Sequence, residues 1–493
     1  MKSRHFLAFD LGAESGRAVL GSLYRLRLSL RELLRFSNEP VQIRGTLYWD
    51  VLALYNNMLK AMRACSQRQR QRIEGIGVDG WGVDFALLGA DGALLENPVH
   101  YRDRRTEGVL EQIQARIPPE TLFRVTGMPL WQIQSACQLL SLRLNRCKLL
   151  ESADGLLMFP DLLSYFLTGE RICERTNAIN TQLYDVHAGT WWREGFDALD
   201  LPFRIMPPLV DPGTTVGPLN AAVATEAGLD RIPVIAPCTH DTASAVAAVP
   251  ASGTNWCFIS SGTWSVVGAL SQQVIPEACS AGLCNELTLG GPFLCRNITG
   301  LWVLQQVRRQ WERQGATYDY GRLVELAKNA PAGQALVNLD DPCFVSPKDM
   351  ETAIRNYCSR TGQTPPEGPG AIARCILESL ALLYRRSTEE ISGFQRRQFD
   401  VLHLVGGGSR NSLLCQFTAN ATRLPVVAGP SEATVAGNVL VQALAAGILE
   451  SPQDIRDCVR RSLPLADYVP KDRDFWEDRY ARFLDVVCRT RNS

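Results

Sequence analysis

The sequence lacks the features of a membrane protein and of a small disulfide-bonded protein. No apolar run approaches the roughly 18 residues that a membrane-spanning helix needs, so no membrane partner is expected. The first apolar run, Phe6–Phe9, stops at Asp10 and is too short for a secretory leader. The 15 Cys are odd in number and include no Cys-x-x-Cys. We therefore expect a cytoplasmic protein with reduced thiols.

Several cysteines stand among apolar neighbours, which favours a role as buried small hydrophobic residues. These are Cys137, Cys173, Cys238 and Cys257. The sequence leaves open whether Cys358 and Cys375 pair with each other.

The chain also lacks an excess of charge of either sign. Lys plus Arg and Asp plus Glu each number 51, so the formal net charge is zero. Only six of the basic residues are Lys, and the 45 Arg are scattered along the chain. Composition does not indicate a basic surface for nucleic acid, so no nucleic-acid partner is expected. The length of 493 residues predicts two or three domains.

Two similar hairpins predict two related α/β domains. The first spans residues 5–24 around a small-residue turn at 10–16, and the second spans 255–270 around a turn at 260–263. A domain boundary is expected near residue 247. The predicted domains are residues 1–246, which would bind sugar and phosphate, 247–450, which would bind the nucleotide, and 451–493, a helical C-terminal extension.

Apolar runs and helical periodicity predict the remaining elements. Strands are expected at 73–78, 85–88, 232–236, 401–405 and 424–428, and helices at 131–144, 300–313, 369–386 and 433–446, with a further helix opening at 239–245.

Three glycine-containing turns could bind phosphate or a nucleotide. The turn at 10–17 places Asp10 at a strand end, where exposed backbone N–H groups can surround phosphate oxygens and the carboxylate could hold Mg²⁺ through water. The turn at 260–263 carries two hydroxyls beside Gly262, and the glycines at 406–408 leave room for a flat base or ribose. Each could also be an ordinary turn. The chain has no Gly-x-x-x-x-Gly-Lys-Ser/Thr phosphate loop.

Asp241, at the start of a predicted helix, is a candidate general base. Its neighbours His240 and Thr242 could hydrogen-bond a substrate hydroxyl. The alternative is a helix cap that favours the dipole. A nucleophile-elbow motif, a Ser-His-Asp triad and a two-His zinc site find no support.

Taken together, these motifs resemble the sugar-kinase family that includes glycerol kinase and xylulokinase, within the actin-like ATPase fold. The resemblance runs in order from about residue 5 to 447, through Phe9–Ala13, Ser15–Arg17, Trp81–Phe85, Tyr101–Asp103, His240–Val246, Ser260–Ser265, Asn297, Gly300–Trp302 and Gly406–Gly408. It implies an α/β fold of two actin-like ATPase (ribonuclease H-like) domains with a cleft between them.

The resemblance also implies residue roles by matched position. Asp241 would be the general base, with sugar contacts from Gly82, His240, Asp241, Thr242 and Asn297. ATP would be held by Ala13, Glu14, Ser15, Gly16, Arg17, Thr263, Gln305 and Gly407, with Mg²⁺ near Asp10. Glu14 departs from the small polar residue that relatives more often carry at this position, and its carboxylate would repel phosphate.

Within the family, the closest resemblance implies phosphorylation of L-rhamnulose at the primary hydroxyl beside its keto group. Other ketoses or polyols (L-fuculose, xylulose, glycerol) are alternatives, as is a nucleotide-binding regulator without catalysis. Trp81 or Phe85 could line the sugar's methyl group, or both could be core residues. Because water must be excluded during phosphoryl transfer, a hinge is expected near residues 246–254.

Overall fold

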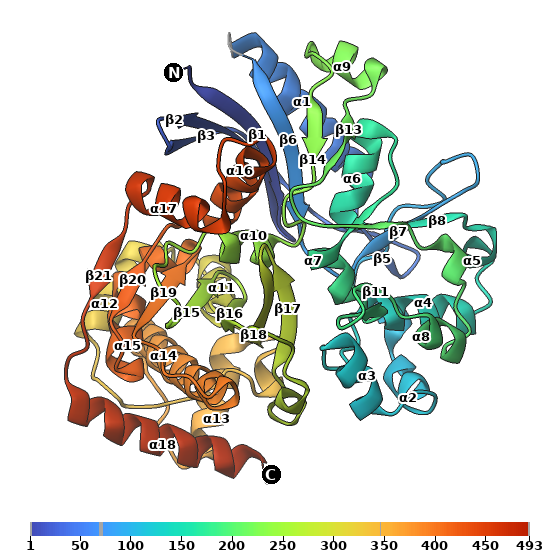
Figure 1. Cartoon of the computed structure of the whole chain (residues 1–493). Coiled ribbons are helices and arrows are strands. Elements are labelled where there is room, and N and C mark those ends of the chain that lie inside the picture. Colours follow the sequence, from blue (N-terminus) through green and yellow to red (C-terminus); the bar gives the residue numbers. More distant parts are fainter. Residues whose placement is uncertain (1, 69–71, 346, 492–493) are drawn as a thin grey trace. The chain divides into compact units, whose positions relative to one another are not determined.

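The computed structural model describes residues 2–68, 72–345 and 347–491, which form two compact units (Figure 1). Unit 1 comprises the residues up to Ala248 together with Ser271–Leu294 and Ala433–Leu463. Unit 2 comprises Val249–Leu270, Cys295–Glu432 and the residues from Pro464 onward. Both units combine segments that are far apart in the sequence, whereas the sequence predicted consecutive domains. Those consecutive boundaries stay a prediction.

Unit 1 is built on a six-stranded sheet in the order β13-β14-β6-β1-β2-β3. Its strands are β1 Arg4–Leu11, β2 Ser15–Tyr24, β3 Arg27–Ser37, β6 Ile73–Gly80, β13 Thr215–Pro218 and β14 Pro233–Ile235. The predicted hairpin at 5–24 is confirmed as β1 and β2. The pairing of β1 with β6 is parallel and places Asp10 opposite Asp79. Parallel pairing brings the carboxyl ends of these strands to one edge of the sheet.

Both faces of β1 are buried, which explains its nearly continuous apolar sequence. Leu7 and Phe9 pack in one cluster with residues of α1 (Val51–Arg68). Phe6 and Ala8 face the opposite side, in a cluster with residues of α10 (Asp241–Ala247) and α16 (Ala433–Ala445).

Helices α10 and α16 approach closely because of a glycine. A Cβ atom at Gly437 would lie 1.9 Å from the carbonyl oxygen of Ser244, so no larger residue fits there. The small residues that predicted a helix at 433–446 thus pack it against α10, within unit 1.

The remaining strands and helices of unit 1 complete its layers. They are β4 Val41–Ile43, β5 Thr46–Tyr48, β7 Phe85–Leu88, α2 Val109–Gln114, α3 Pro119–Thr126, α4 Ser135–Leu144, α5 Lys148–Ser152, β8 Gly155–Met158, α6 Phe159–Thr168, β9 Cys173–Glu174, α7 Arg175–Ala178, β10 Tyr184–Asp185, β11 Thr190–Trp191, α8 Arg193–Ala198, β12 Leu209–Val210, α9 Ala221–Ala227, β17 Cys284–Thr288 and α17 Pro452–Ser462.

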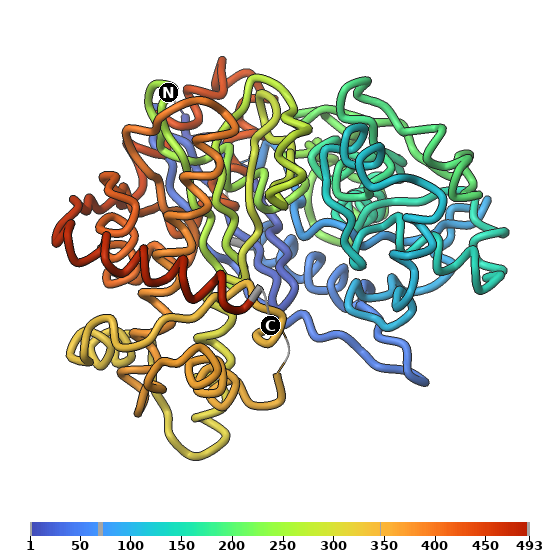
Figure 2. The backbone as a smooth tube through the Cα atoms, turned by 90° about the horizontal axis from the view of Figure 1, so that it is seen from below, coloured from blue at the N-terminus to red at the C-terminus, as the bar shows by residue number. Residues whose placement is uncertain are grey.

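Unit 2 has a sheet in which β16, β15, β19, β20 and β21 are neighbours in that order. These strands are β15 Trp256–Ser261, β16 Ser265–Leu270, β19 Val401–Val405, β20 Val426–Ala428 and β21 Ala466–Tyr468. The strands β15, β19 and β20 run parallel. The helices are α11 Trp302–Arg313, α12 Tyr320–Asn329, α13 Met350–Arg360, α14 Gly368–Gln395, α15 Ser412–Thr422 and α18 Arg473–Arg491. Figure 2 shows α18 (dark red) as one continuous helix.

Two helix predictions were wrong at one end. The helix expected at 131–144 begins only at Ser135, because a turn precedes it in which the side chain of Gln134 accepts a hydrogen bond from the backbone N–H of Trp131. The helix expected at 369–386 continues to Gln395. Ser387 and Thr388 interrupt its apolar pattern, but their hydroxyls donate to backbone carbonyls one turn earlier.

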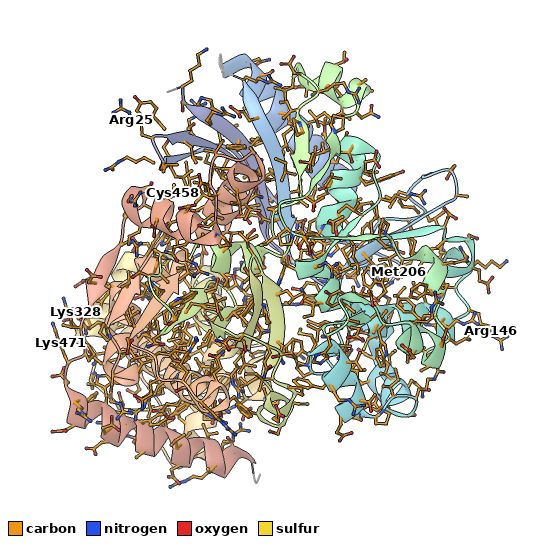
Figure 3. The ribbon with its side chains drawn as sticks, in the orientation of Figure 1. Arg25, Arg146, Met206, Lys328, Cys458 and Lys471 are labelled. Carbon is orange, nitrogen blue, oxygen red and sulfur yellow. The ribbon has the colours of Figure 1, made fainter. Side chains whose placement is uncertain are left out.

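Cysteine burial agrees with the sequence. Eleven of the 15 Cys are buried, including the four named above and Cys458 on α17 (Figure 3). Cys358 and Cys375 are both buried, free thiols.

The basic side chains labelled in Figure 3, Arg25, Arg146, Lys328 and Lys471, are exposed on four separate segments. Within the described residues, no helix combines the length and apolar character needed to span a bilayer.

Candidate active site

The turn between β1 and β2 is tight and is closed by one backbone and one side-chain hydrogen bond. The N–H of Gly12 donates to the carbonyl of Ser15 at 2.9 Å, and the Asn38 side chain donates to the Gly12 carbonyl at 2.9 Å. This leaves Ala13 and Glu14 at the tip of the turn. Glu14 is exposed to solvent.

Asp10 and Arg17 face each other across the hairpin. The guanidinium donates to Asp10 Oδ2 from Nη2 at 2.6 Å and from Nε at 2.8 Å. Both side chains are mostly buried, with 13% and 16% exposed. Arg17, predicted to hold ATP, is therefore already a partner of the Asp10 carboxylate.

A second carboxyl group, Asp79, lies beside Asp10 on the neighbouring strand β6. It is fully buried at the position paired with Asp10. Burial raises the pKa of Asp79 well above its ordinary value, and the charges of Asp10 and Asp241 raise it further. The sheet thus gathers three acidic side chains from β1, β6 and α10.

Asp241 lies at the same edge of the sheet, because the residues just before it pair with the end of β6. The N–H of Gly80 donates to the carbonyl of Thr239 at 2.9 Å, and Gly80 and His240 form a parallel bridge. Asp241 is the first residue of α10, and Thr242 Oγ1 donates to its Oδ1 at 3.1 Å.

About a third of the Asp241 side chain remains exposed. Burial raises the pKa of Asp241, the charge of His240 opposes this, and the net direction is upward. Asp241 is thus an accessible carboxyl group with a raised affinity for a proton, as a general base requires.

Glu174 is a further residue of this edge, which the sequence did not predict. Its buried carboxylate accepts hydrogen bonds from the backbone N–H of Thr239 at 2.8 Å and from the Thr239 hydroxyl at 3.1 Å. It also accepts from the N–H of Thr176 at 2.8 Å and from the Thr176 hydroxyl. Burial raises the pKa of Glu174 to about 7. No motif marks this residue, because its partner Thr239 lies 65 positions away.

The loop after β6 is closely packed around Gly82. A Cβ atom there would lie 2.9 Å from the Asn180 side chain. The next residue, Val83, has a φ of +71°, which is strained for a β-branched residue. Ser135 Oγ donates to the Val83 carbonyl at 2.6 Å and holds the loop in this conformation.

Trp81 and Phe85, the two aromatic residues flanking this loop, are 8% and 5% exposed. The Trp81 ring lies 4.2 Å from that of Phe159, and its N–H donates to Asp84 at 2.9 Å. These contacts favour the core interpretation of Trp81.

In unit 2, parallel pairing of β15 with β19 brings two of the predicted turns together. Ser260, the first residue of the predicted turn at 260–263, lies in β15 and pairs with Val405, the last residue of β19. Gly406 and Gly408 pack on Ser261, since Cβ atoms there would lie 2.8 Å and 2.1 Å from its oxygens. A Cβ atom at Gly407, in contrast, would have no neighbour within 4 Å. Gly407 therefore faces open space that a ligand could occupy.

The start of α11 lies against the same turn. The Thr263 carbonyl accepts from the N–H of Trp302 at 3.0 Å. Gly300 has a φ of +61°, and a Cβ atom there would lie 2.7 Å from Thr263, so glycine is required. Gln305 follows within the first turn of α11, and its buried Oε1 has no hydrogen-bond partner among the described residues.

The structure thus groups the predicted site residues by unit. In unit 1 one edge of the sheet collects Asp10, Ala13, Glu14, Ser15, Gly16, Arg17, Gly82, His240, Asp241 and Thr242. Unit 2 contains Thr263, Asn297, Gln305 and Gly407, with Asn297 near the end of β18 (Gly291–Ile298).

Curated proteins of similar sequence match nearly the whole chain. A rhamnulokinase of Bacteroides thetaiotaomicron is 43% identical over 487 residues, covering 98% of this chain and 99% of the relative. A rhamnulokinase of Enterococcus faecalis is 36% identical over 492 residues and covers 98% of both chains.

Solved structures share the fold at low sequence identity. A xylulose kinase from Lactobacillus acidophilus superposes with a TM-score of 0.83 at 17% identity, covering 99% of this chain and 98% of the other. A Plasmodium falciparum glycerol kinase with ADP gives a TM-score of 0.78 at 16% identity, with coverage of 99% and 98%. The predicted fold class is confirmed by these likenesses.

Family matches cover both halves of the chain. Residues 5–248 match the N-terminal domain of the FGGY family of carbohydrate kinases, and residues 257–446 match its C-terminal domain. The chain therefore belongs to the FGGY family of carbohydrate kinases.

Proposed function

We propose that the chain transfers the γ-phosphoryl group of ATP to the primary hydroxyl beside the keto group of L-rhamnulose, giving L-rhamnulose 1-phosphate and ADP. The observation that carries this substrate is the identity of 34–43% to curated rhamnulokinases, over 95–98% of this chain. The accessible carboxylate of Asp241, beside two hydrogen-bonding neighbours, supports the reaction type.

Asp241 is the proposed general base. As the γ-phosphorus bonds to the sugar oxygen, the O–H bond breaks and its proton passes to the Asp241 carboxylate. The bond between the γ-phosphorus and the bridging oxygen breaks, and ADP leaves with its electron pair. The raised pKa of Asp241 suits this role because a more basic carboxylate accepts the proton more readily.

Further residues are proposed to contact the sugar. In unit 1 these are Gly82, whose lack of a side chain lets the backbone lie close to Asn180, together with His240 and Thr242. In unit 2 the proposed contact is Asn297.

The nucleotide is proposed to bind through backbone and small side chains. The β1–β2 turn, Ala13 to Arg17, would hold phosphate oxygens through its N–H groups. Thr263, Gln305 and Gly407 would hold the rest of ATP. The open space at Gly407 and the buried Oε1 of Gln305 fit a flat, donor-bearing base.

The acidic edge of unit 1 fits Mg²⁺. The charges of Asp10 and Asp241 each raise the pKa of Asp79, so the three carboxyl groups repel one another and a divalent cation would relieve that repulsion. Carboxylate oxygens suit Mg²⁺, which keeps much of its water, and we propose that Asp10 holds the ion through water. When bound, the ion neutralises phosphate charge.

The decisive experiment measures ADP release from Mg-ATP with L-rhamnulose, L-fuculose, D-xylulose, glycerol and no sugar. We expect kcat/KM to be highest for L-rhamnulose. One extra methyl group discriminates by only about 1–3 kcal/mol, so related ketoses should be slow substrates rather than inert. A higher kcat/KM with another sugar overturns the L-rhamnulose assignment. ATP binding without transfer to any sugar favours a regulator.

A further inference from the structure

The imidazole of His240 lies between two carboxylates. Its Nδ1 is 3.3 Å from Oε2 of Glu286, and its Nε2 is 3.7 Å from Oδ1 of Asp241. Burial increases along this series, since 33% of the Asp241 side chain is exposed, 13% of His240 and 2% of Glu286. The His240 ring therefore lies between the Asp241 carboxylate, which solvent reaches, and the Glu286 carboxylate, which it does not.

Glu286 is held rigidly by its strand. It lies in β17, whose Thr288 hydroxyl donates to the Ala243 carbonyl in α10 at 2.7 Å. On the other side of Glu286, the N–H of Asn285 donates to the Gly127 carbonyl at 2.8 Å. Hydrogen bonds thus fix the chain on both sides of Glu286, and the bond from Thr288 joins β17 to α10, the helix that begins with Asp241.

The charges of three acidic groups on three elements act on the His240 ring: Glu286 on β17, Asp241 on α10 and Glu174 on β9. Burial by itself would lower the pKa of His240. The adjacent carboxylate of Glu286, followed by the charges of Asp241 and Glu174, outweighs burial and raises the pKa of His240. The ring therefore favours the imidazolium form, in which both nitrogens donate.

We infer that Glu286 is a positioning residue for the proposed base Asp241, because its carboxylate pairs with Nδ1 of the His240 ring and so keeps Nε2 on the side of the Asp241 carboxylate. The partner of one ring nitrogen sets the protonation and orientation of the other. This inference rests on the proposed function of Asp241. The imidazolium keeps Asp241 ionised until the sugar proton arrives. Glu286 acts through His240 and need not touch the sugar.

The test compares the wild type with Glu286→Gln and Glu286→Asp. Glu277 is exposed and lies in Ser271–Leu294, the segment that also contains Glu286. The variant Glu277→Gln is therefore a control for the loss of one negative charge. The chain has only five His, so ¹⁵N-histidine spectra can be assigned by removing the His240 signal with His240→Gln. The ¹⁵N shifts report the protonation state of each ring nitrogen.

In Glu286→Gln we expect His240 to lose its proton at lower pH than in the wild type, and the acidic limb of kcat/KM to move to higher pH. We expect kcat to fall by about tenfold, the change that about 1.4 kcal/mol in the barrier produces. Glu286→Asp should recover part of both effects, and Glu277→Gln should behave like the wild type.

An unchanged His240 titration and pH profile in folded Glu286→Gln overturns the inference. If Glu286→Gln does not fold, the test uses Glu286→Asp instead. Its shorter side chain must still shift both the titration of His240 and the pH profile of kcat/KM, and no shift in either overturns the inference. Failure of the wild type to phosphorylate any sugar overturns the proposed function instead. The ¹⁵N spectra separate the two failures, since they need no substrate.

Discussion

Asn438 on α16 donates a hydrogen bond of 2.5 Å to Oδ2 of Asp79 at the end of β6. Asn438 is itself held, because Gln442 Nε2 donates to its Oδ1 at 2.7 Å and to the Leu7 carbonyl at 3.2 Å. All of these groups are buried. Two amide side chains on one helix therefore provide a hydrogen-bond donor for one oxygen of a buried carboxyl group near the proposed active site, 359 positions away in the sequence.

Replacing Asn438 by Ala should destabilise the protein. Asp79 Oδ2 would lose its donor while remaining buried, which costs about 1–3 kcal/mol. Thermal unfolding should show a lower Tm. Glu277→Gln, at an exposed position, provides the matched control with no expected change. An unchanged Tm in Asn438→Ala would show that water replaces the amide.

Asp241→Asn should abolish most phosphoryl transfer while leaving ATP binding intact. Loss of a general base costs roughly 10²- to 10⁴-fold in kcat. The wild-type rate should rise with pH as Asp241 loses its proton, and this limb should lie above the usual range for Asp because burial raises the pKa of Asp241. The measurements are kcat against pH and calorimetric titration with ATP. Full turnover by Asp241→Asn would disprove the assignment.

Glu174 should make stability depend on pH. Burial raises the pKa of Glu174 from 4.5 to about 7, so the folded state holds this proton more tightly than the unfolded state does. The stabilisation is complete below pH 4.5 and is lost as the pH rises through about 7, by roughly 3 kcal/mol.

The Glu174→Gln variant isolates this contribution, because glutamine does not titrate. Urea unfolding at about pH 5 and about pH 8 should show the wild type losing stability relative to the variant at the higher pH. A constant difference between the two proteins at both pH values would contradict the assignment.

Gly407 and Gly408 form a matched pair of test positions. Gly407→Leu should leave the Tm unchanged, because the new side chain enters open space, and should raise the KM for ATP about tenfold by filling the proposed nucleotide site. Gly408→Ala should instead lower the stability by about 1–3 kcal/mol, since its Cβ would lie 2.1 Å from Ser261 Oγ. The checks are thermal unfolding and initial rates across ATP concentrations. Normal ATP kinetics in Gly407→Leu would place the nucleotide elsewhere.

Much of the local structure could be predicted from the sequence. The strands expected at 5–9 and 401–405 lie within β1 and β19, and the helix expected at 300–313 is α11, which begins at Trp302. Strand β3 and helix α1 were not predicted. Half of β3 is exposed and carries charged residues, and its alternation of polar and apolar residues is irregular.

The sequence by itself determined the hairpins, the glycine turns and the position of Asp241 at the start of a helix, because these follow from local sterics and hydrophobic periodicity. Only the tertiary structure decided which buried groups meet: Asn438 with Asp79, Glu174 with Thr239, and Glu286 with His240. A buried polar group must find a partner, but any segment that the fold brings near can supply one. That choice depends on packing between segments distant in the sequence, and no local pattern records it.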